Sequence, residues 1–462
     1  MLFGTTLLSG SFLGINMRNL YFCAFCTLLS GLVLFSFSSV ADERSSPQNK
    51  PLGQPDAYEL NALLRLVDSD PSVRAARQDA EKLGVEVDLV DLSRSPTLDF
   101  TTRGRYPITS KIDSVQDRFS DLDERYVDGV FTVNVPLTDF GVSDAKKEAA
   151  SLRAQAAALK INLVKQTTLA EILVMSLQVN SLNQSLIELQ AILSKMQSRV
   201  EESRMRYEGG TGALQAVRSL ELKLVEIESR IMKAKYERDL LSQQFERRFD
   251  ASIVEYLPTA VYFSYLLKSK GQFDVVDRDS PMMLQLELSA LNFDSLAVDR
   301  SRFPDINGSI SATLFNVDSR LGKEYDVVGG ISGSMPLVDA GSRDAQLRQI
   351  GLKQQIVDEE LVMDAREAFA EWEAVNTKRD EINADIESLR LKKASIAQDL
   401  KELKLRAQTL EGKPTDLAVT EMEAGLMVID ELSLHSELQQ STINSLVVSE
   451  QLLLEVLKQG QR

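Results

Sequence analysis

The sequence predicts a mainly helical, internally duplicated protein with a smaller β part, and three observations support this fold class. The stretch PLTDFGVSDA at 136–145 recurs as PLVDAGSRDA at 336–345, displaced by 200 positions with six of ten residues identical. Long stretches of the chain contain no Gly or Pro, which favours unusually long helices. Before each copy of the repeated stretch, short segments alternate polar and apolar residues, which is the period of a β-strand.

Composition limits the possible partners. The 462 residues include 52 Lys and Arg against 68 Asp and Glu. Because nucleic acid requires a basic surface against its phosphates, this balance argues against a nucleic-acid partner.

Residues 1–41 are predicted to be a signal peptide. Arg18 precedes an apolar run that ends in Ser39-Val40-Ala41 before a polar stretch, the pattern of a secretory signal cut after Ala41. A membrane anchor is the alternative, and translation starts at either Met1 or Met17. Both cysteines, Cys23 and Cys26, lie within this segment, so the exported chain is expected to lack disulfides.

Beyond this segment no window approaches the roughly 18 apolar residues of a membrane helix, so any membrane insertion must use strands. The rest of the chain divides into a first repeat (42–257), a connection (258–280) and a second repeat (281–462). Each repeat is expected to contain a helix, two strands and a long helical hairpin.

The long helices are expected between Gly141 and Gly210 and between Gly341 and Gly412, each reaching roughly 100 Å at 1.5 Å per residue. Apolar residues recur in steps of four and three within 182–200 and 382–403. Such seams require partner helices wound alongside. Return helices over about 213–249 and 417–459 are expected to fill this place.

Four strands are expected, over 98–106, 131–136, 305–314 and 330–336, each with one polar and one apolar face. A soluble sheet packed on helices is one interpretation. The signal peptide, strands near ten residues long and polar loops at one end fit an outer-membrane barrel better. Four strands cannot close a barrel, and an open edge in lipid is costly. Three copies would supply twelve strands, and their helices would form a hollow cylinder.

The repeated stretch marks a strand-to-helix corner, and three residue types recur there 200 positions apart. These are Pro136 and Pro336, Asp139 and Asp339, and Gly141 and Gly341. The prolines are expected to end strands, the aspartates to cap the following helices, and the glycines to allow close packing at the junction.

These features resemble the TolC-like outer membrane efflux proteins, the outer membrane factors of tripartite export systems. The resemblance rests on the PLTDFG and PLVDAG corners, the lead-in SVRAARQDAEKLGVEVDLVDLSRSPTLDF, and the turns RYEGGTG and EGKPTDLAV. It covers nearly all of the chain after residue 41. It implies a homotrimer in the outer membrane, with a twelve-stranded β-barrel, a periplasmic helical barrel and no cofactor. Its implied partners are outer-membrane lipid, a periplasmic adaptor and an inner-membrane transporter of ABC or RND type.

In that family the two turns form the periplasmic tip where the adaptor docks. The matching residues here are Gly210, Thr211, Gly212, Gly412, Lys413 and Pro414. The family's usual Asp six residues after the tip Gly is replaced by Ala216 and Ala418, which puts its charged latch in doubt. Glu421 matches an acidic position that rings the entrance in some members. A solvated helix charge is the alternative for Glu421.

Other chemistry is sparse, which argues against an enzyme. His435 has one carboxylate, Glu431, on the same helix face, too few ligands for a metal site. GGTG lacks the Lys-Ser/Thr ending of a phosphate-binding loop. The acidic loop from Asp113 to Asp128 does not have the spacing of a calcium loop, so a solvated outer loop is expected.

The sequence therefore predicts a passive, gated conduit through the outer membrane, driven by an inner-membrane transporter. Type I protein secretion and small-molecule efflux both remain open as its role. The absence of a cysteine placed for lipid attachment and the altered tips favour secretion. The alternative is a periplasmic coiled-coil scaffold without a pore, which would be soluble without detergent.

Overall fold

The computed structural model describes residues 57–105, 126–268, 273–274, 277–315, 324–408 and 414–460. The chain forms two compact units, residues 1–51 and 52–462. The first unit lies outside the described residues, and so does the expected signal peptide within it. The tip residues Gly412 and Lys413 and most of the acidic loop at 113–128 also lie outside them.

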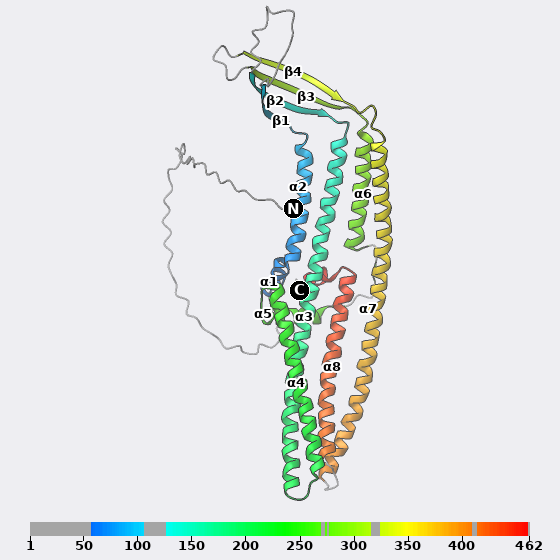
Figure 1. Cartoon of the computed structure of the whole chain (residues 1–462). Coiled ribbons are helices and arrows are strands. Elements are labelled where there is room, and N and C mark those ends of the chain that lie inside the picture. Colours follow the sequence, from blue (N-terminus) through cyan, green and yellow to red (C-terminus); the bar gives the residue numbers. More distant parts are fainter. Residues whose placement is uncertain are drawn as a thin grey trace, which may run out of the picture. The chain divides into compact units, whose positions relative to one another are not determined.

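Helices dominate the described part of the second unit, and four strands complete it (Figure 1). The first half contains α1 (Ala57–Ser69), α2 (Pro71–Leu92), β1 (Thr97–Arg105), β2 (Tyr126–Thr138), α3 (Val142–Glu208), α4 (Leu214–Phe249) and α5 (Ile253–Leu266). The second half contains α6 (Asp279–Arg300), β3 (Asp305–Phe315), β4 (Glu324–Ser334), α7 (Ser342–Gln408), α8 (Pro414–Val448) and α9 (Leu452–Gly460). The expected fold class, mainly helical with four strands, is confirmed.

Strands and helices follow the same lateral order. The sheet is antiparallel with the order β1-β2-β3-β4. Strands β1 to β4 are joined in the chain to α2, α3, α6 and α7 respectively. Among these helices α2 packs on α3, α3 on α6, and α6 on α7. Each strand therefore continues into the helix that holds the same place in the helical layer (Figure 1).

The long helices α3 and α7 each have 67 residues and run from the sheet to the opposite end of the layer (Figure 1). Further from the sheet, α4 packs on α3, while α8 packs on both α3 and α7. The lateral order there is α4-α3-α8-α7. The layer is thus four helices wide in both halves: α2, α3, α6 and α7 near the sheet, and α4, α3, α8 and α7 further from it. Among the described helices, none combines the length and hydrophobicity needed to cross a membrane.

The register of the sheet gathers apolar side chains on one face, because directly opposed residues in antiparallel strands share a face. Phe131, for example, lies opposite Phe100 on one side and Ala312 on the other. The apolar face is formed by Leu98, Phe100, Phe131, Val133, Ile310, Ala312, Leu314, Val327 and Ile331. On the other face, Asn134 donates to Asp99 at 3.2 Å. The apolar face is exposed, with Leu98 at 68% and Ile331 at 76%.

Two apolar cores hold the helices together. One joins α1, the start of α2, α3, the end of α4, α5, α8 and α9 near the middle of the layer, around Leu63, Leu173, Phe245 and Phe263. The other lies between the two hairpins and contains Leu186, Leu189, Met196 and Val200 of α3 with residues of α4 and α8. The expected seam in 182–200 therefore supplies this second core.

Some boundaries differ from expectation. Pro136 does not end its strand, because β2 continues to Thr138 through a bulge between these two residues. A bulge leaves one residue outside the regular ladder, so a missing N–H is tolerated there. Pro336 lies beyond β4, which ends at Ser334.

The second return helix, expected as one piece over 417–459, is instead broken between α8 and α9. Glu450 in this break has a positive φ of 56°, which a helix cannot contain. Asp250, 200 positions earlier, has a φ of 51° between α4 and α5. Helix α5 crosses the expected boundary between the first repeat and the connection.

Candidate functional site

The two strand-to-helix corners share one geometry. The Asp139 carboxylate accepts the N–H groups of Gly141 at 3.0 Å and Ser143 at 2.6 Å. The Asp339 carboxylate likewise accepts the N–H groups of Gly341 at 3.1 Å and Arg343 at 3.2 Å. These bonds satisfy N–H groups that the first turn of a helix leaves unpaired.

The caps change the acidity of both carboxyl groups. Partial burial alone would raise the pKa of Asp139, but hydrogen bonds from Ser143 and Gly141 hold it below its usual value. The backbone N–H groups of Gly341 and Arg343 lower the pKa of Asp339 in the same way. Both aspartates are therefore stabilised in the charged form, which also suits a helix N-terminus.

The corner glycines differ in packing. Gly141 and Gly341 have φ values of 86° and 82°, which favour glycine. A Cβ on Gly141 would lie 2.5 Å from Nη1 of Arg300, which donates to the Gly141 carbonyl at 3.1 Å. No described atom lies within 4 Å of the corresponding point at Gly341. The expectation of close packing therefore fails at Gly341 in the protomer, where only the φ angle requires glycine.

The tip between α3 and α4 is a tight turn. Gly210 has a φ of 75° and Thr211 donates its N–H to the Arg206 carbonyl at 2.9 Å. A Cβ on Gly212 would lie 2.8 Å from the Tyr207 nitrogen, so this position requires glycine for space. Three apolar side chains are exposed beside the turn, Met205, Tyr207 and Leu214.

The second tip is described only from Pro414, which begins α8 as proline commonly begins a helix. Four residues later, Ala418 is fully buried in the core between the hairpins. A carboxylate there would be buried without a partner, at high cost. This packing explains why alanine stands where the family pattern has Asp.

Glu421 is bound within its own protomer. Arg199 of α3 donates from Nε at 3.2 Å and from Nη2 at 3.1 Å to Oε2 of Glu421 in α8. Burial alone would lower the pKa of Arg199, but hydrogen bonds to Glu202 and Glu421 raise it. The side chains of Arg199 and Glu421 are 31% and 19% exposed. This contact ties the two hairpins together, and sequence reasoning missed it because 222 positions separate the partners.

A second missed cluster lies where α6, α7 and the α8–α9 break meet. Arg278 donates to Glu450 at 3.1 and 3.2 Å and to Asp364 at 3.1 Å. Glu450 also accepts the N–H of Ser280 at 3.0 Å, capping α6 from a distant part of the chain. The side chains of Arg278 and Glu450 are only 7% and 8% exposed. This buried cluster fixes three elements to one another.

The single histidine is exposed on α8, and Glu431 pairs with Lys393 rather than with it. Within the described ranges, no group of three or more His, Cys, Asp and Glu side chains is placed to hold a metal ion.

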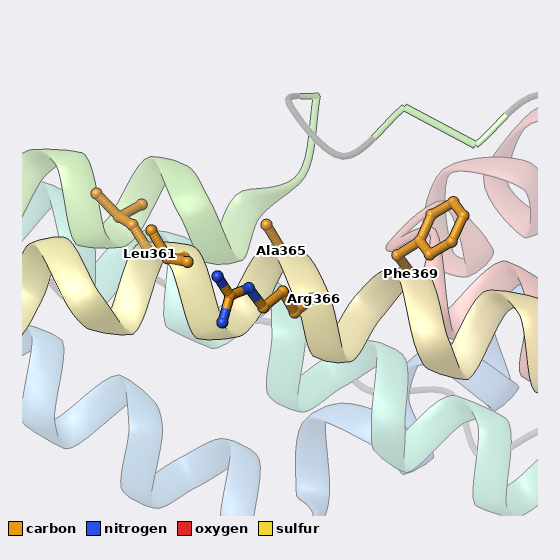
Figure 2. A pocket seen from close by; sticks show the side chains of 5 residues that line it. Leu361, Ala365, Arg366 and Phe369 are labelled. Carbon is orange, nitrogen blue, oxygen red and sulfur yellow. The ribbon is translucent and has the colours of Figure 1, made fainter.

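Both lateral edges of the helical layer expose apolar side chains. At one edge these are Val85, Leu89 and Leu92 of α2 and Leu222, Val225, Met232 and Tyr236 of α4. At the other edge they are Leu352, Ile356, Val362, Met363, Phe369 and Leu391 of α7. Figure 2 shows part of α7, where Leu361, Val362, Ala365, Arg366 and Phe369 line a shallow hollow of about 590 Å³.

The fold is thus a sheet with an exposed apolar face that continues strand by strand into a layer of long helices. Residues 63–246 match the family model described as outer membrane efflux protein. In sequence over these residues and in fold, the chain resembles the TolC-like outer membrane efflux proteins. The family consists of efflux proteins, which agrees with the expectation that the chain is not an enzyme.

Solved structures share the fold. The outer membrane protein VceC from Vibrio cholerae has a TM-score of 0.68 and 16% identity, covering 85% of this chain and 96% of its own. The Neisseria gonorrhoeae MtrE outer membrane channel in its open state has a TM-score of 0.68 and 16% identity, covering 85% and 89%. The Campylobacter jejuni CmeC outer membrane channel has a TM-score of 0.67 and 11% identity, covering 85% and 86%. No curated protein sequence matches the chain significantly.

Proposed function

We propose that three copies of this chain form a passive channel that crosses the outer membrane and continues through the periplasm. The observation that carries the proposal is the common lateral order of strands and helices. The sheet and the helical layer have their free edges on the same two sides of the protomer. One lateral association between copies would therefore close both.

The free edges fit this association. The β4 strand of one copy would pair with the β1 strand of the next copy, and the two would run antiparallel. This is the same relation that joins neighbouring strands within the protomer. Below the sheet, α7 would lie beside α2 and then α4 of the next copy, covering the apolar side chains of both edges. Cyclic closure leaves no open strand edge, and four strands from each of three copies give a twelve-stranded barrel.

The apolar face of the sheet is suited to outer-membrane lipid. The strands contain 9, 13, 11 and 11 residues. A tilted strand crosses a membrane with about 9–11 residues. With the apolar face turned to lipid, the polar face lines the channel, as in membrane barrels. The long helices would then extend into the periplasm.

Energy for transport would come from a partner. The GGTG stretch lacks the ending of a phosphate-binding loop, and the resemblance to the efflux proteins implies an inner-membrane transporter of ABC or RND type with a periplasmic adaptor. The adaptor would dock at the two tips, and at the first of them Met205, Tyr207 and Leu214 offer exposed apolar area. The cargo class stays open between secreted protein and small molecule. The Arg199–Glu421 contact would hold the hairpins together in the closed state.

The first test is to extract the protein from membranes in detergent, determine its mass by native mass spectrometry, and record conductance in a planar bilayer. A trimer that forms discrete channels is the expected result. A protein that is soluble without detergent and conducts nothing would overturn the channel and favour the scaffold.

Two substitutions on β4 make the test specific. Ile331 and Val328 are both exposed, but Ile331 lies on the apolar face opposite Gly308, whereas Val328 lies on the polar face opposite Ser311. Ile331→Glu should weaken insertion, because a charged side chain that faces lipid is destabilising. Val328→Glu should insert normally. Equal behaviour of the two variants would contradict the assignment of the faces.

A further inference from the structure

The free face of α2 carries two opposite charges seven residues apart. Arg74 and Glu81 lie about two turns apart on one face. The buried residues Val73 and Ala76 lie about a quarter turn and nearly half a turn around α2 from these charges. Both charged side chains are exposed, and within the described ranges neither forms an ion pair.

The free face of α7 carries the same spacing with the charges in a complementary order. Arg366 and Glu373 are seven residues apart, opposite the buried Val357 and Ala368. Both are exposed and, in the part of the chain that the structure describes, without an ion pair. Arg366 lies at the hollow that Phe369 also lines (Figure 2).

Contacts inside the protomer place these parts of α2 and α7 at similar levels. Lys165 of α3 pairs with Asp68, just before α2, at 3.0 Å. Asp279, the first residue of α6, lies beside Asn162 of α3. Arg278, just before α6, pairs with Asp364 of α7 at 3.1 Å. Arg74 is thus near the level of Asp364, with Glu373 roughly 10–15 Å nearer the tip at 1.5 Å per residue.

A step of this size between neighbouring copies depends on how far the helices tilt from the axis of the ring. Four helices about 10 Å apart that tilt by about 20° would accumulate a shift of about 14 Å. Since α2 runs toward the sheet and α7 away from it, their contact is antiparallel. Placing Arg74 opposite Glu373 then puts Glu81 opposite Arg366 and Val85 opposite Val362.

We propose that these two ion pairs between adjacent copies, Arg74 with Glu373 and Glu81 with Arg366, set the vertical register of the assembly. The inference rests on the proposed trimer and names the contact that aligns its subunits. Apolar side chains on both edges supply attraction without direction, whereas charge order discriminates between registers. A slip of one heptad in one direction would place Arg74 against Arg366 and Glu81 against Glu359, opposing like charges in both pairs. A slip in the other direction would place Glu81 against Glu373 and Arg74 against Asp380, so that one favourable pair is lost and a repulsive one is formed.

The same register brings Asp88 near Glu359, which is an unfavourable contact between exposed carboxylates. This contact gives a test in the opposite direction. Glu359→Arg should slow dissociation of the trimer, while Glu360→Arg, on the neighbouring side of α7, should leave the rate unchanged. A faster dissociation with Glu359→Arg would contradict the register.

Cysteine cross-linking tests the register directly. In a chain with Cys23→Ser and Cys26→Ser, the pair Val85→Cys with Val362→Cys should form disulfides between chains, seen as linked dimers and trimers on non-reducing gels. The pairs Val85→Cys with Ile356→Cys and Val85→Cys with Phe369→Cys represent shifted registers. Their yield should be at least about fivefold lower, because a disulfide requires Cα atoms within about 7 Å.

Charge reversal tests the cause of the register. Arg74→Glu should reduce the Val85–Val362 cross-link several-fold, and adding Glu373→Arg should restore it. Lys82→Glu, a reversal about a quarter turn away on α2, should have no effect. The reduction should weaken in high salt, where exposed charges are screened.

The outcomes separate this inference from the proposed function. A native trimer that cross-links better through a shifted pair, or through none of the pairs, overturns the register and leaves the channel intact. A trimer that cross-links through Val85 and Val362 but ignores the Arg74 and Glu373 reversals overturns the role of the charges and leaves the packing of the apolar edges to set the register. A wild-type chain without trimers overturns both proposals.

Discussion

Gly425 of α8 lies against Ile192 of α3 so closely that a Cβ on the glycine would be 2.6 Å from Cγ1 of the isoleucine. The backbone of one hairpin therefore touches a side chain of the other. We expect Gly425→Ala to lower the free energy of unfolding by about 1–3 kcal/mol through overpacking. Thermal and urea unfolding, followed by far-UV circular dichroism, would measure this loss.

Gly351 provides the matched control, because it also lies inside a helix but has no described atom within 4 Å of an added Cβ. Gly351→Ala should raise the free energy of unfolding by about 0.5–1 kcal/mol, since alanine favours helix. Adding Ile192→Val to Gly425→Ala should recover part of the loss. Equal effects of the two alanine substitutions would show that helix propensity, and not contact, determines both.

The buried pair of Arg278 and Glu450 should be costly to break from one side. Arg278→Met leaves a buried carboxylate without its partner and should lower the free energy of unfolding by about 3–5 kcal/mol. The double variant with Glu450→Gln should be markedly more stable than Arg278→Met alone. Fluorescence of Trp372, the only tryptophan, would report local change, since it stacks on Phe273 at 5.0 Å. Additive losses would contradict a coupled pair.

The cap at Asp139 should depend on pH. Because the folded state lowers the pKa of Asp139, its charged form adds stability above the unfolded value of about 3.8, and this is lost as pH falls through the lower folded pKa. Asp139→Ala should cost about 1 kcal/mol at neutral pH and progressively less in acid. Asp139→Asn, which keeps an acceptor without the charge, should show a loss that also shrinks as the wild-type carboxylate is protonated. A constant gap between wild type and Asp139→Ala down to pH about 2 would argue against this role.

The contact between Arg199 and Glu421 should affect ion selectivity if Glu421 faces the entrance. Arg199→Gln would free the carboxylate, and three such charges in a ring should raise the preference for cations on the order of twofold. Reversal potentials in a planar bilayer measure this preference. Arg204→Gln, which breaks the exposed pair with Glu221, serves as control. Unchanged selectivity in Arg199→Gln would leave Glu421 as a charge that joins two helices.

Local patterns were sufficient to predict the strands and long helices. The 200-residue repeat and the change from period two to seams of four and three residues are visible in the sequence. The ends were less accurate: β2 continues past Pro136, because a bulge removes the usual penalty for proline. The break at Glu450 was missed, since glutamate gives no local sign of a positive φ, which here accompanies a distant bond to Ser280.

The site was predictable only where it depends on neighbouring residues. Asp139 is close in sequence to Gly141 and Ser143, whose N–H groups it accepts. The partner of Glu421 could not be inferred, because Arg199 approaches it only when two hairpins pack. The replacement of the family's Asp by Ala418 was noticed, but its cause, burial in the core between the hairpins, requires the structure.

Four helices lie side by side along the layer, and this count fixes the calibre of the proposed tube. Three copies give a ring of twelve helices, and at a spacing of about 10 Å the ring is roughly 38 Å across between helix axes. Subtracting a helix diameter of about 10 Å leaves a bore of roughly 28 Å, more than twice the width of a single helix. An extended or helical polypeptide would pass through such a bore as readily as a small molecule, which assigns selection of cargo to the tip and its partners.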